Sequence, residues 1–396
     1  MTSLYFDYNA TTPLSVKAQL AIKDAMSIFA NPSSHYSLSD MAKKLLIDAR
    51  RSMASLMGTV PEQILFTSGG TESNNQALSS LLATLPGSDL SAHHVISSSI
   101  EHPSVLAPLL WYQQRGLQLT LINPDNQGRI SVQSIQENLR PQTRLITLMA
   151  INNETGVIQP YEAVASLAKE AGVYLHIDAV QAIGKLSFSC DTLSGVTTVS
   201  FSGHKFNGPK GIGGLYHAPG IQLNPLLHGG GQEQGVRSGT ENTLGLAGLT
   251  AAAKESLNGL QERFNTYKTL RETLLSLLEQ HRVNYLINGN TNPAFQAPWT
   301  LNLSFPGIRA ESLASRLDLR HGISLSLGSA CSNNKSTQRS HVLVAMGLPD
   351  DRIDSAVRIS FGYTTSQDDI EILANAIKQE TYNLLKISGQ SLITQE

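Results

Sequence analysis

Short runs of β-branched and apolar residues alternate with helix-like segments between about residues 60 and 220 of this 396-residue chain. This alternation is typical of a sheet that buries both of its faces beneath the helices connecting its strands. The strand-like runs are residues 63–66, 94–98, 117–122, 144–151, 173–177, 198–201 and 213–216. We therefore predict an α/β sheet with helices on both faces, and we expect its ligand beyond the carboxyl ends of the strands.

The rest of the chain predicts a second, smaller unit. A proline-free pattern rich in Leu, Ala, Glu and Lys runs from Asn242 to about His281, which predicts one long helix or two. Strand-like segments at 301–305, 323–327 and 357–361 then alternate with a helix-like segment at 310–320 and a final helix from about residue 366. We predict a large domain over residues 15–255 and a small α+β domain from residues 1–14 and 256–396.

The composition excludes several classes of protein. The 29 basic and 31 acidic residues give a net charge of −2, so we expect no direct nucleic-acid partner and no membrane partner. No apolar run approaches a membrane span and the N-terminus lacks a signal pattern, which predicts a cytoplasmic protein. With only two cysteines, no C-x-x-C and no H-E-x-x-H, the sequence predicts neither a disulfide framework nor a zinc site.

Two segments predict a pyridoxal phosphate (PLP) site. Lys205 offers the amine that forms the Schiff base in such enzymes, and Asp178 offers the carboxylate that usually faces the pyridine nitrogen. A buried Asp178 would keep that nitrogen protonated, which the ring needs in order to act as an electron sink. Gln181 is placed to meet the phenolic oxygen of the ring. Ser202 and His204 offer a hydroxyl and an imidazole to the phosphate.

Glycine-rich turns predict where that phosphate binds. The segment 66–75 places two glycines between a strand and a helix, so backbone N–H groups and the Thr71 hydroxyl face an anion. The alternative is an ordinary capped turn. The loop 228–242 is a second phosphate-reaching candidate. No Walker loop and no complete dinucleotide fingerprint is present, which argues against an NAD enzyme.

Four further residues carry candidate chemistry, each with a structural alternative. His102 lies between a strand and a helix, where it can stack on a planar cofactor and exchange protons, or simply complete a turn. Asn153 can bind a ligand or form an Asx turn. Arg358 can clamp an amino acid carboxylate or form a structural ion pair. Cys331 lies among small and polar residues that suit a thiolate nucleophile, whereas Cys190 is interpreted as a small core residue.

Taken together, these segments resemble the cysteine desulfurases, a class V branch of the fold-type I PLP enzymes, over nearly the whole chain. The matching motifs occur in the family's order at residues 7–13, 67–75, 101–102, 152–160, 176–185, 202–214, 229–242 and 328–331. The spacing after Cys331 resembles that of the IscS/NifS-like group. Breaking a carbon–sulfur bond benefits from an electron sink at Cα and from a soft nucleophile, which agrees with the residues present.

The resemblance implies a large domain with a mainly parallel seven-stranded sheet flanked by helices, and a smaller α+β domain that carries a cysteine loop at about residues 326–340. It implies a homodimer that converts L-cysteine to L-alanine and transfers the sulfur to Cys331 as a persulfide. A sulfur-acceptor protein would follow, for iron–sulfur clusters, tRNA thiolation or DNA phosphorothioation. In the implied site, Lys205 forms the Schiff base, Asp178 faces the pyridine nitrogen, Gln181 meets the phenolic oxygen and His102 lies over the ring. The phosphate is held by Gly70, Thr71, Ser202 and His204 of one subunit and by Thr240 of the second subunit. Asn153 and Arg358 bind the substrate carboxylate, and Cys331 is the nucleophile.

Some positions depart from the family pattern. The segment 31–34 is followed by His35 and Tyr36, where the family usually has one residue and then a histidine. Ser39 stands where a glycine is common, and Gln234 occupies a usually basic position. No Lys or Arg occurs between Lys210 and Arg237. We expect the docking surface for a housekeeping iron–sulfur scaffold to be altered, because charged patches set partner choice. Two alternatives stay open: a selenocysteine lyase or other class V PLP enzyme, and a catalytically silent sulfur-relay or interaction protein.

Overall fold

The computed structural model describes residues 3–83, 89–327 and 339–388. Its larger sheet has seven strands in the order β2-β8-β7-β6-β5-β3-β4. Four neighbouring pairs are parallel, and β8 pairs antiparallel with β2 and β7. The strands are β2 Ile64–Thr67, β3 His94–Ser98, β4 Gln118–Ile122, β5 Thr143–Met149, β6 Tyr174–Asp178, β7 Thr198–Ser202 and β8 Gly213–His217. The predicted α/β fold is confirmed, with strand ends that differ from the predicted ones by one or two residues.

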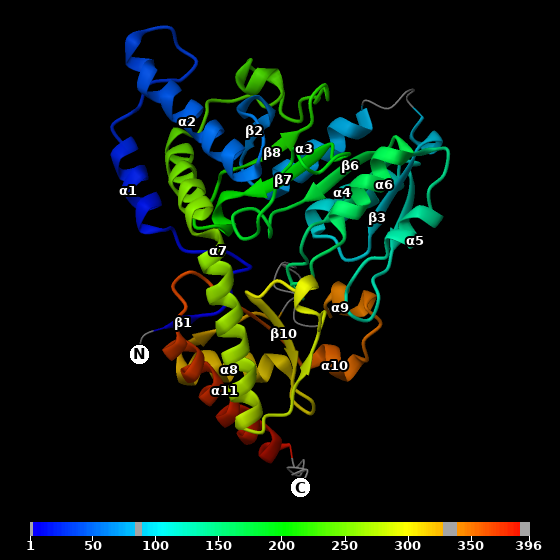
Figure 1. Ribbon diagram of the computed structural model, residues 1–396, viewed down its shortest axis with the longest axis vertical. Helices are drawn as coiled ribbons and strands as arrows, with labels where there is room; N and C mark the ends of the chain where they lie inside the picture. The colour runs from blue at the N-terminus through cyan, green and yellow to red at the C-terminus, as the bar shows by residue number, and fades with distance from the viewer. Residues whose placement is uncertain (1–2, 84–88, 328–338, 389–396) are drawn as a thin grey trace.

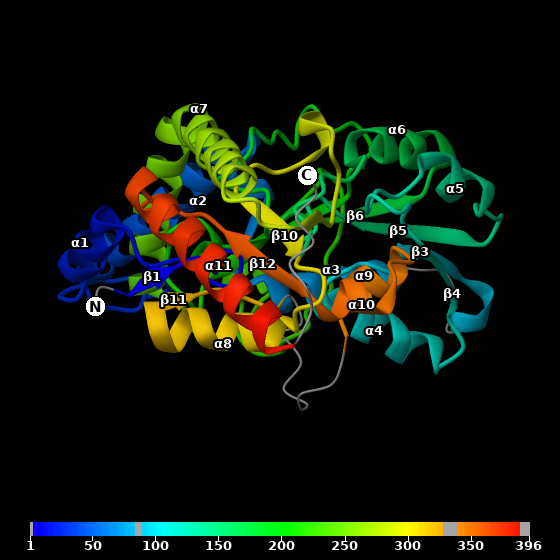
Figure 2. The ribbon, with the colours of Figure 1, turned by 90° about the horizontal axis from the view of Figure 1, so that it is seen from below.

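Helices cover both faces of this sheet. Figure 2 shows α5 (Val132–Glu137) and α6 (Tyr161–Ala171) over one face and α4 (Pro103–Gln113) over the other, beside α3 (Gly70–Ala83). The inner strands β3 and β7 are buried along their whole length, and β6 is buried from Leu175 onward.

A smaller sheet lies in the lower half of Figure 1. In it, β10 (Thr300–Ser304) pairs antiparallel with β12 (Ala356–Ser360) and with the short β9 (Leu286–Ile287). A two-stranded parallel pair joins β1 (Leu4–Tyr5) to β11 (Ile323–Ser324). The helices of this part are α8 Ala310–His321, α9 His341–Ala345, α10 Asp350–Asp354 and α11 Gln367–Ile387. The strand predicted at 323–327 is therefore shorter than expected, and β1 and β9 were too short to leave a pattern.

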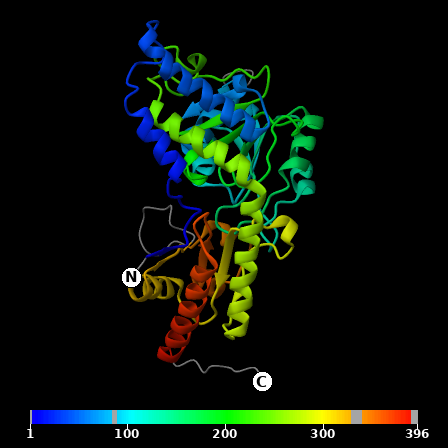
Figure 3. The same cartoon turned by 60° about the vertical axis from the view of Figure 1, so that its left-hand side comes forward.

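One long helix connects the two parts. The sequence left one helix or two open, and the structure has a single α7 (Thr243–Gln280), whose N-cap Asn242 accepts a hydrogen bond from the Gly245 N–H. Figures 1 and 3 show α7 running from beside the larger sheet to the smaller one. Its first half packs on α1 (Val16–Ala25) and α2 (Asp40–Met57). The predicted boundary at 255/256 falls inside α7, and the division into domains stays a prediction.

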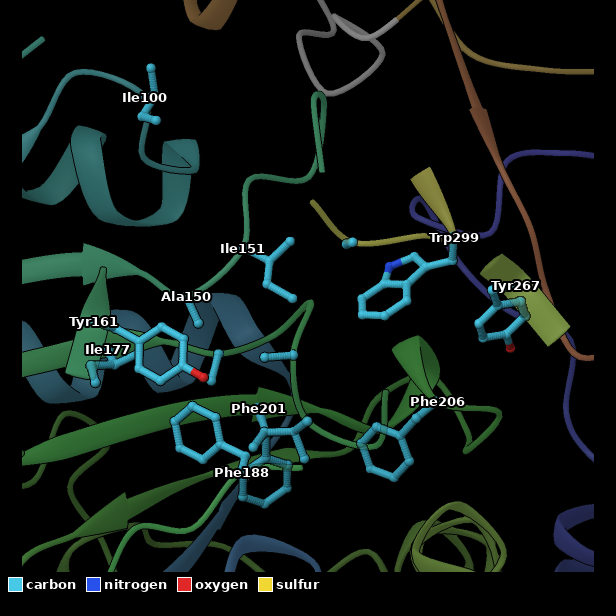
Figure 4. Packing of buried hydrophobic residues seen from close by; sticks show 14 of the residues in the cluster. Ile100, Ala150, Ile151, Tyr161, Ile177, Phe188, Phe201, Phe206, Tyr267 and Trp299 are labelled. Atoms are coloured by element: carbon cyan, nitrogen blue, oxygen red, sulfur yellow. The ribbon is translucent and has the colours of Figure 1, made fainter. Parts of the chain in front are cut away.

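Figure 4 shows part of the buried hydrophobic core, in which aromatic residues pack together. Trp299 is 1% exposed and meets Tyr267 edge to face, with ring centroids 6.1 Å apart. Tyr161 stacks on Phe188 at 5.5 Å in the large part. Cys190 is buried as predicted, and burial raises the pKa of its thiol, so it is an inert core residue.

Within the described ranges, no helix is long and apolar enough to cross a membrane.

Candidate active site

Parallel strands end together at one edge of the larger sheet, and the candidate residues follow those ends. Asp178 closes β6, Ser202 closes β7, and Lys205 follows in the single turn Gly203–Lys205. Glu101 and His102 come after β3, with His102 directly before α4. The sequence therefore places its polar residues where α/β sheets bind ligands.

The carboxylate of Asp178 is held by two donors. Its Oδ1 accepts from the Val180 N–H at 3.0 Å and its Oδ2 accepts from Asn74 Nδ2 at 2.8 Å. Because a carboxylate only accepts, the amide nitrogen of Asn74 must face Asp178, and the amide oxygen then faces His176 Nε2 at 3.0 Å. His176 therefore carries its proton on Nε2. Burial lowers the pKa of His176 to about 4, so the imidazole is neutral.

His102 belongs to the same hydrogen-bonded set. Asn74 Nδ2 also donates to Ser104 Oγ at 2.8 Å, and Ser104 Oγ lies 2.7 Å from His102 Nδ1. Nδ1 accepts the Ser104 backbone N–H at 3.1 Å and so caps α4. Neutral His102 thus carries its proton on Nε2. The pKa of His102 is lowered, and burial is the main cause. The ring lines a cavity of about 650 Å³ together with Thr71 and Trp111. The structural alternative, in which His102 only completes a turn, accounts for the contacts of Nδ1 but gives no role to Nε2.

The predicted phosphate cradle is assembled around a second cavity of about 470 Å³. Gly70, Thr71, Ser202 and His204 all line it. Helix α3 begins at Gly70, where a Cβ would lie 2.8 Å from Val180 Cγ2, so only glycine brings the backbone this close. Ser202 Oγ is buried and has no partner among the described residues. A helix N-terminus, two hydroxyls and an imidazole fit the phosphate of PLP.

Lys205 is tied to the N-terminal segment. Its Nζ donates to the carbonyls of Asn9 at 2.6 Å and Ala10 at 2.8 Å. The Asn9 carbonyl also accepts from Gln181 Nε2 at 2.9 Å. Gln181 Oε1 in turn accepts from Lys185 Nζ at 2.9 Å. The amine predicted to bind the cofactor and the amide predicted to meet the phenolic oxygen therefore share one acceptor and lie side by side.

Arg358 and Asn153 meet at the boundary between the two parts. Arg358 is 3% exposed on β12; it donates to the Asn153 carbonyl at 3.1 Å and forms an ion pair with Asp7. Its Nε is buried without a partner among the described residues. The ion pair that the structural alternative predicted is present, and the role of Arg358 as a carboxylate clamp stays a prediction. The Asx turn belongs to Asn152, whose Oδ1 accepts the Glu154 N–H, and not to Asn153.

The structure does not bring Thr240 to this site. Thr240 is exposed on the glycine-rich loop and, within the described part of the chain, makes no side-chain hydrogen bond to the other candidates. Its predicted role needs a partner subunit. Cys331 lies outside the described residues. No group of His, Cys, Asp or Glu in the described ranges is arranged to hold a metal ion.

Sequence reasoning missed the residues that hold the candidates in place. Asn74 and Ser104 join Asp178 to His102, while Asn9 joins Lys205 to Gln181. The sequence placed Asn74 in the motif at residues 67–75, but its burial on α3, which requires partners for its polar side chain, is seen only in the structure. Asn9 lies in the motif at residues 7–13, but no local signal revealed its role, since that role depends on a chain crossing from a distant segment.

The comparisons with known proteins agree with this geometry. The Aminotransferase class-V model matches residues 4–373. The putative cysteine desulfurase IscS 1 of Bacillus subtilis is 38% identical over 379 residues, which cover 95% of this chain and 98% of that protein. A solved NifS-like protein superposes with a TM-score of 0.87 at 32% identity, covering 96% of this chain and 99% of the other. A structure described as SspA in complex with cysteine gives a TM-score of 0.77 at 34% identity, covering 91% of this chain and 99% of the other.

These findings confirm the predicted fold and the predicted PLP dependence. The relatives match along nearly their whole length, so the likeness extends across both parts of the fold. The roles of the individual site residues stay predictions. By sequence and by structure, the chain belongs to the aminotransferase class-V family, among the cysteine desulfurases.

Proposed function

We propose that this protein is a PLP-dependent cysteine desulfurase that converts L-cysteine to L-alanine and transfers the sulfur to Cys331 as a persulfide. The observation that carries the proposal is the arrangement at one sheet edge of Asp178, Lys205 and a phosphate cradle with an orphaned Ser202 hydroxyl. A cradle alone would fit many anions. Together with an amine and a held carboxylate, in a chain of this family, it fits PLP.

The cofactor, when bound, supplies an electron sink for negative charge developing beside the substrate Cα. Asp178 supplies the negative charge that keeps the ring nitrogen protonated, and Asn74 keeps that carboxylate oriented. Lys205 binds the cofactor and, when released, is an amine that can move a proton. His102, which lines a cavity and carries its proton on Nε2, is the second candidate for proton transfer.

The substrate carboxylate is assigned to Arg358 and Asn153, which are already in contact. Cys331 is assigned the sulfur. Its thiol loses a proton and bonds to the substrate sulfur while the carbon–sulfur bond breaks. The proton that the thiol loses is returned to the substrate carbon that carried the sulfur. Cysteine and the enzyme thiol thereby become alanine and an enzyme persulfide without an external oxidant.

The remaining assignments are also proposals. The protein acts as a cytoplasmic homodimer in which Thr240 of the partner subunit completes the phosphate site, and its two domains span residues 15–255 and residues 1–14 with 256–396. An acceptor protein takes the sulfur from Cys331. The absence of Lys and Arg between Lys210 and Arg237 favours an acceptor other than a housekeeping iron–sulfur scaffold, because charge complementarity selects partners.

The test is a product assay on the purified protein loaded with PLP. L-cysteine should yield alanine and protein-bound sulfur in equal amounts, and Cys331→Ser should lose the bound sulfur while Cys190→Ser keeps it. Turnover of L-selenocysteine with no turnover of L-cysteine would favour the selenocysteine lyase. Absence of alanine from both substrates, with PLP bound, would favour the silent relay protein.

A further inference from the structure

Lys185 lies close to the cofactor lysine but has no role in the proposed chemistry. It follows Gly184, a residue with φ +78° whose Cβ would lie 2.6 Å from Phe206 Cβ, so the chain is pressed against the core just before the lysine. Its Nζ lies 5.6 Å from the ring centroid of Trp299, which Figure 4 shows beside Phe206 and Tyr267. A small cavity of about 20 Å³ is lined by both Lys185 and Lys205.

The contacts of Lys185 settle which way the Gln181 amide points. The lysine amine has N–H groups to donate, so the atom of Gln181 that lies 2.9 Å from it must be the oxygen Oε1. The Asn9 carbonyl is an acceptor only, so the atom facing it at 2.9 Å must be the nitrogen Nε2. Both neighbours require the same orientation, and a flipped amide would oppose donor to donor and acceptor to acceptor.

We propose that Lys185 is a positioning residue of the PLP site, which locks Gln181 so that its amide nitrogen, and not its oxygen, faces the cofactor beside Asn9 and Lys205. The inference rests on the proposed function, because it assumes that PLP binds at Lys205. The amide nitrogen carries two N–H groups; one donates to Asn9, and the other donates to the phenolic oxygen. With the lock removed, Gln181 can also present its oxygen, which would repel that phenolate.

The role does not depend on the charge of Lys185, since both the ammonium and the neutral amine donate. Burial first, and then the charges of Lys205 and Arg358, hold the pKa of Lys185 well below its usual range. Other ionisable groups line the small cavity beside it, namely Tyr8, Arg263, Tyr267 and Tyr363. A direct electrostatic action on Lys205 is therefore the competing explanation, and it predicts a different result in a double-mutant cycle.

The experiment measures the pKa of the visible absorption band of the lysine-linked cofactor in Lys185→Met, in Gln181→Leu and in the double variant. Loss of a donor to the phenolate disfavours the unprotonated form, so each single variant should raise the band's pKa, by about one unit, which is a tenfold change in the equilibrium. If Lys185 acts through Gln181, the double variant should equal Gln181→Leu alone. Lys185→Gln, which restores an N–H donor without a charge, should recover most of the shift.

Additive shifts in the double variant, or an unchanged band in Lys185→Met, would overturn the inference. Lys169→Met is the matched control, because among the described residues the Lys169 amine donates only to Ser194 Oγ, in an exposed hydrogen bond, and the change should not affect the band. Should Lys185→Met fail to fold, Lys185→Gln decides: a wild-type band supports the lock and a fully shifted band contradicts it. A wild-type protein that takes up no PLP would refute the proposed function itself, which separates the two failures.

Discussion

Replacing Asn74 by alanine should destabilise the protein strongly, although the residue lies on a helix where alanine is favourable. Asn74 is 1% exposed and makes three hydrogen bonds through one amide, to Asp178, Ser104 and His176. The change removes all three at once. Two of the partners, the Asp178 carboxylate and the His176 imidazole, are then left buried with one donor or acceptor unmatched.

The magnitude follows from those partners. A hydrogen bond to a charged group contributes about 1.5–3 kcal/mol, and a buried imidazole N–H without an acceptor costs about 1–3 kcal/mol. Alanine is a better helix former than asparagine by at most about 0.7 kcal/mol. We therefore expect the free energy of unfolding to fall by about 2–5 kcal/mol, and the affinity for PLP to fall with it because Asp178 loses its alignment.

Urea denaturation of the PLP-free protein measures the first quantity. Asn75→Ala is the matched control: it has the same gain in helix propensity, but its amide donates only to the carbonyls of Thr71 and Ser104, and its loss should cost less than about 1 kcal/mol. Equal stabilities for Asn74→Ala and Asn75→Ala would refute the reasoning, since the network would then contribute nothing.

Three further outcomes are expected. Lys205→Ala should fold and still retain PLP weakly but should lose the visible band; a borohydride-reducible band in this variant would show that another amine binds the cofactor. Arg358→Ala should raise KM for cysteine about 30-fold, the equivalent of about 2 kcal/mol for a lost charge-assisted pair, with little loss of PLP; unchanged kinetics would leave Arg358 only a structural role through Asp7 and Asn153. Burial raises the pKa of Glu101 from 4.5 to about 8, so its contribution to stability is complete below about pH 4.5 and is lost as the pH rises through 8. Glu101→Gln should flatten that part of the stability profile in denaturant titrations at successive pH values, and a profile unchanged by the substitution would exclude Glu101 as its source.

The sequence predicted the larger sheet well because its strands are short segments built around β-branched and apolar residues, such as Val95 and Ile96 in β3 and Leu175 and Ile177 in β6. It could not predict β1 or β9, which are two residues long and are held by partners far along the chain. Strands of that length carry no period of their own, so only the fold reveals them.

The candidate site divides in the same way. Asp178, Lys205 and the glycine turn at Gly70 carry chemistry in their residue type and in their place after a strand, so they could be named from the sequence. Asn9 carries its role through a backbone carbonyl, which every residue has. The identity of its side chain therefore could not predict that role, because the role depends on the N-terminal segment crossing to the larger sheet.

The central claim is that Cys331 receives sulfur from cysteine at a PLP site built on Lys205. The most direct measurement is mass spectrometry of the intact and digested protein after one equivalent of L-cysteine is added to the PLP-loaded enzyme in the absence of reductant. The account predicts one added sulfur atom on the peptide that contains Cys331, alanine in equal amount, and neither product in Lys205→Ala. Added sulfur on Cys190 instead, or alanine formed at the wild-type rate with no sulfur on Cys331 at any time, would contradict it.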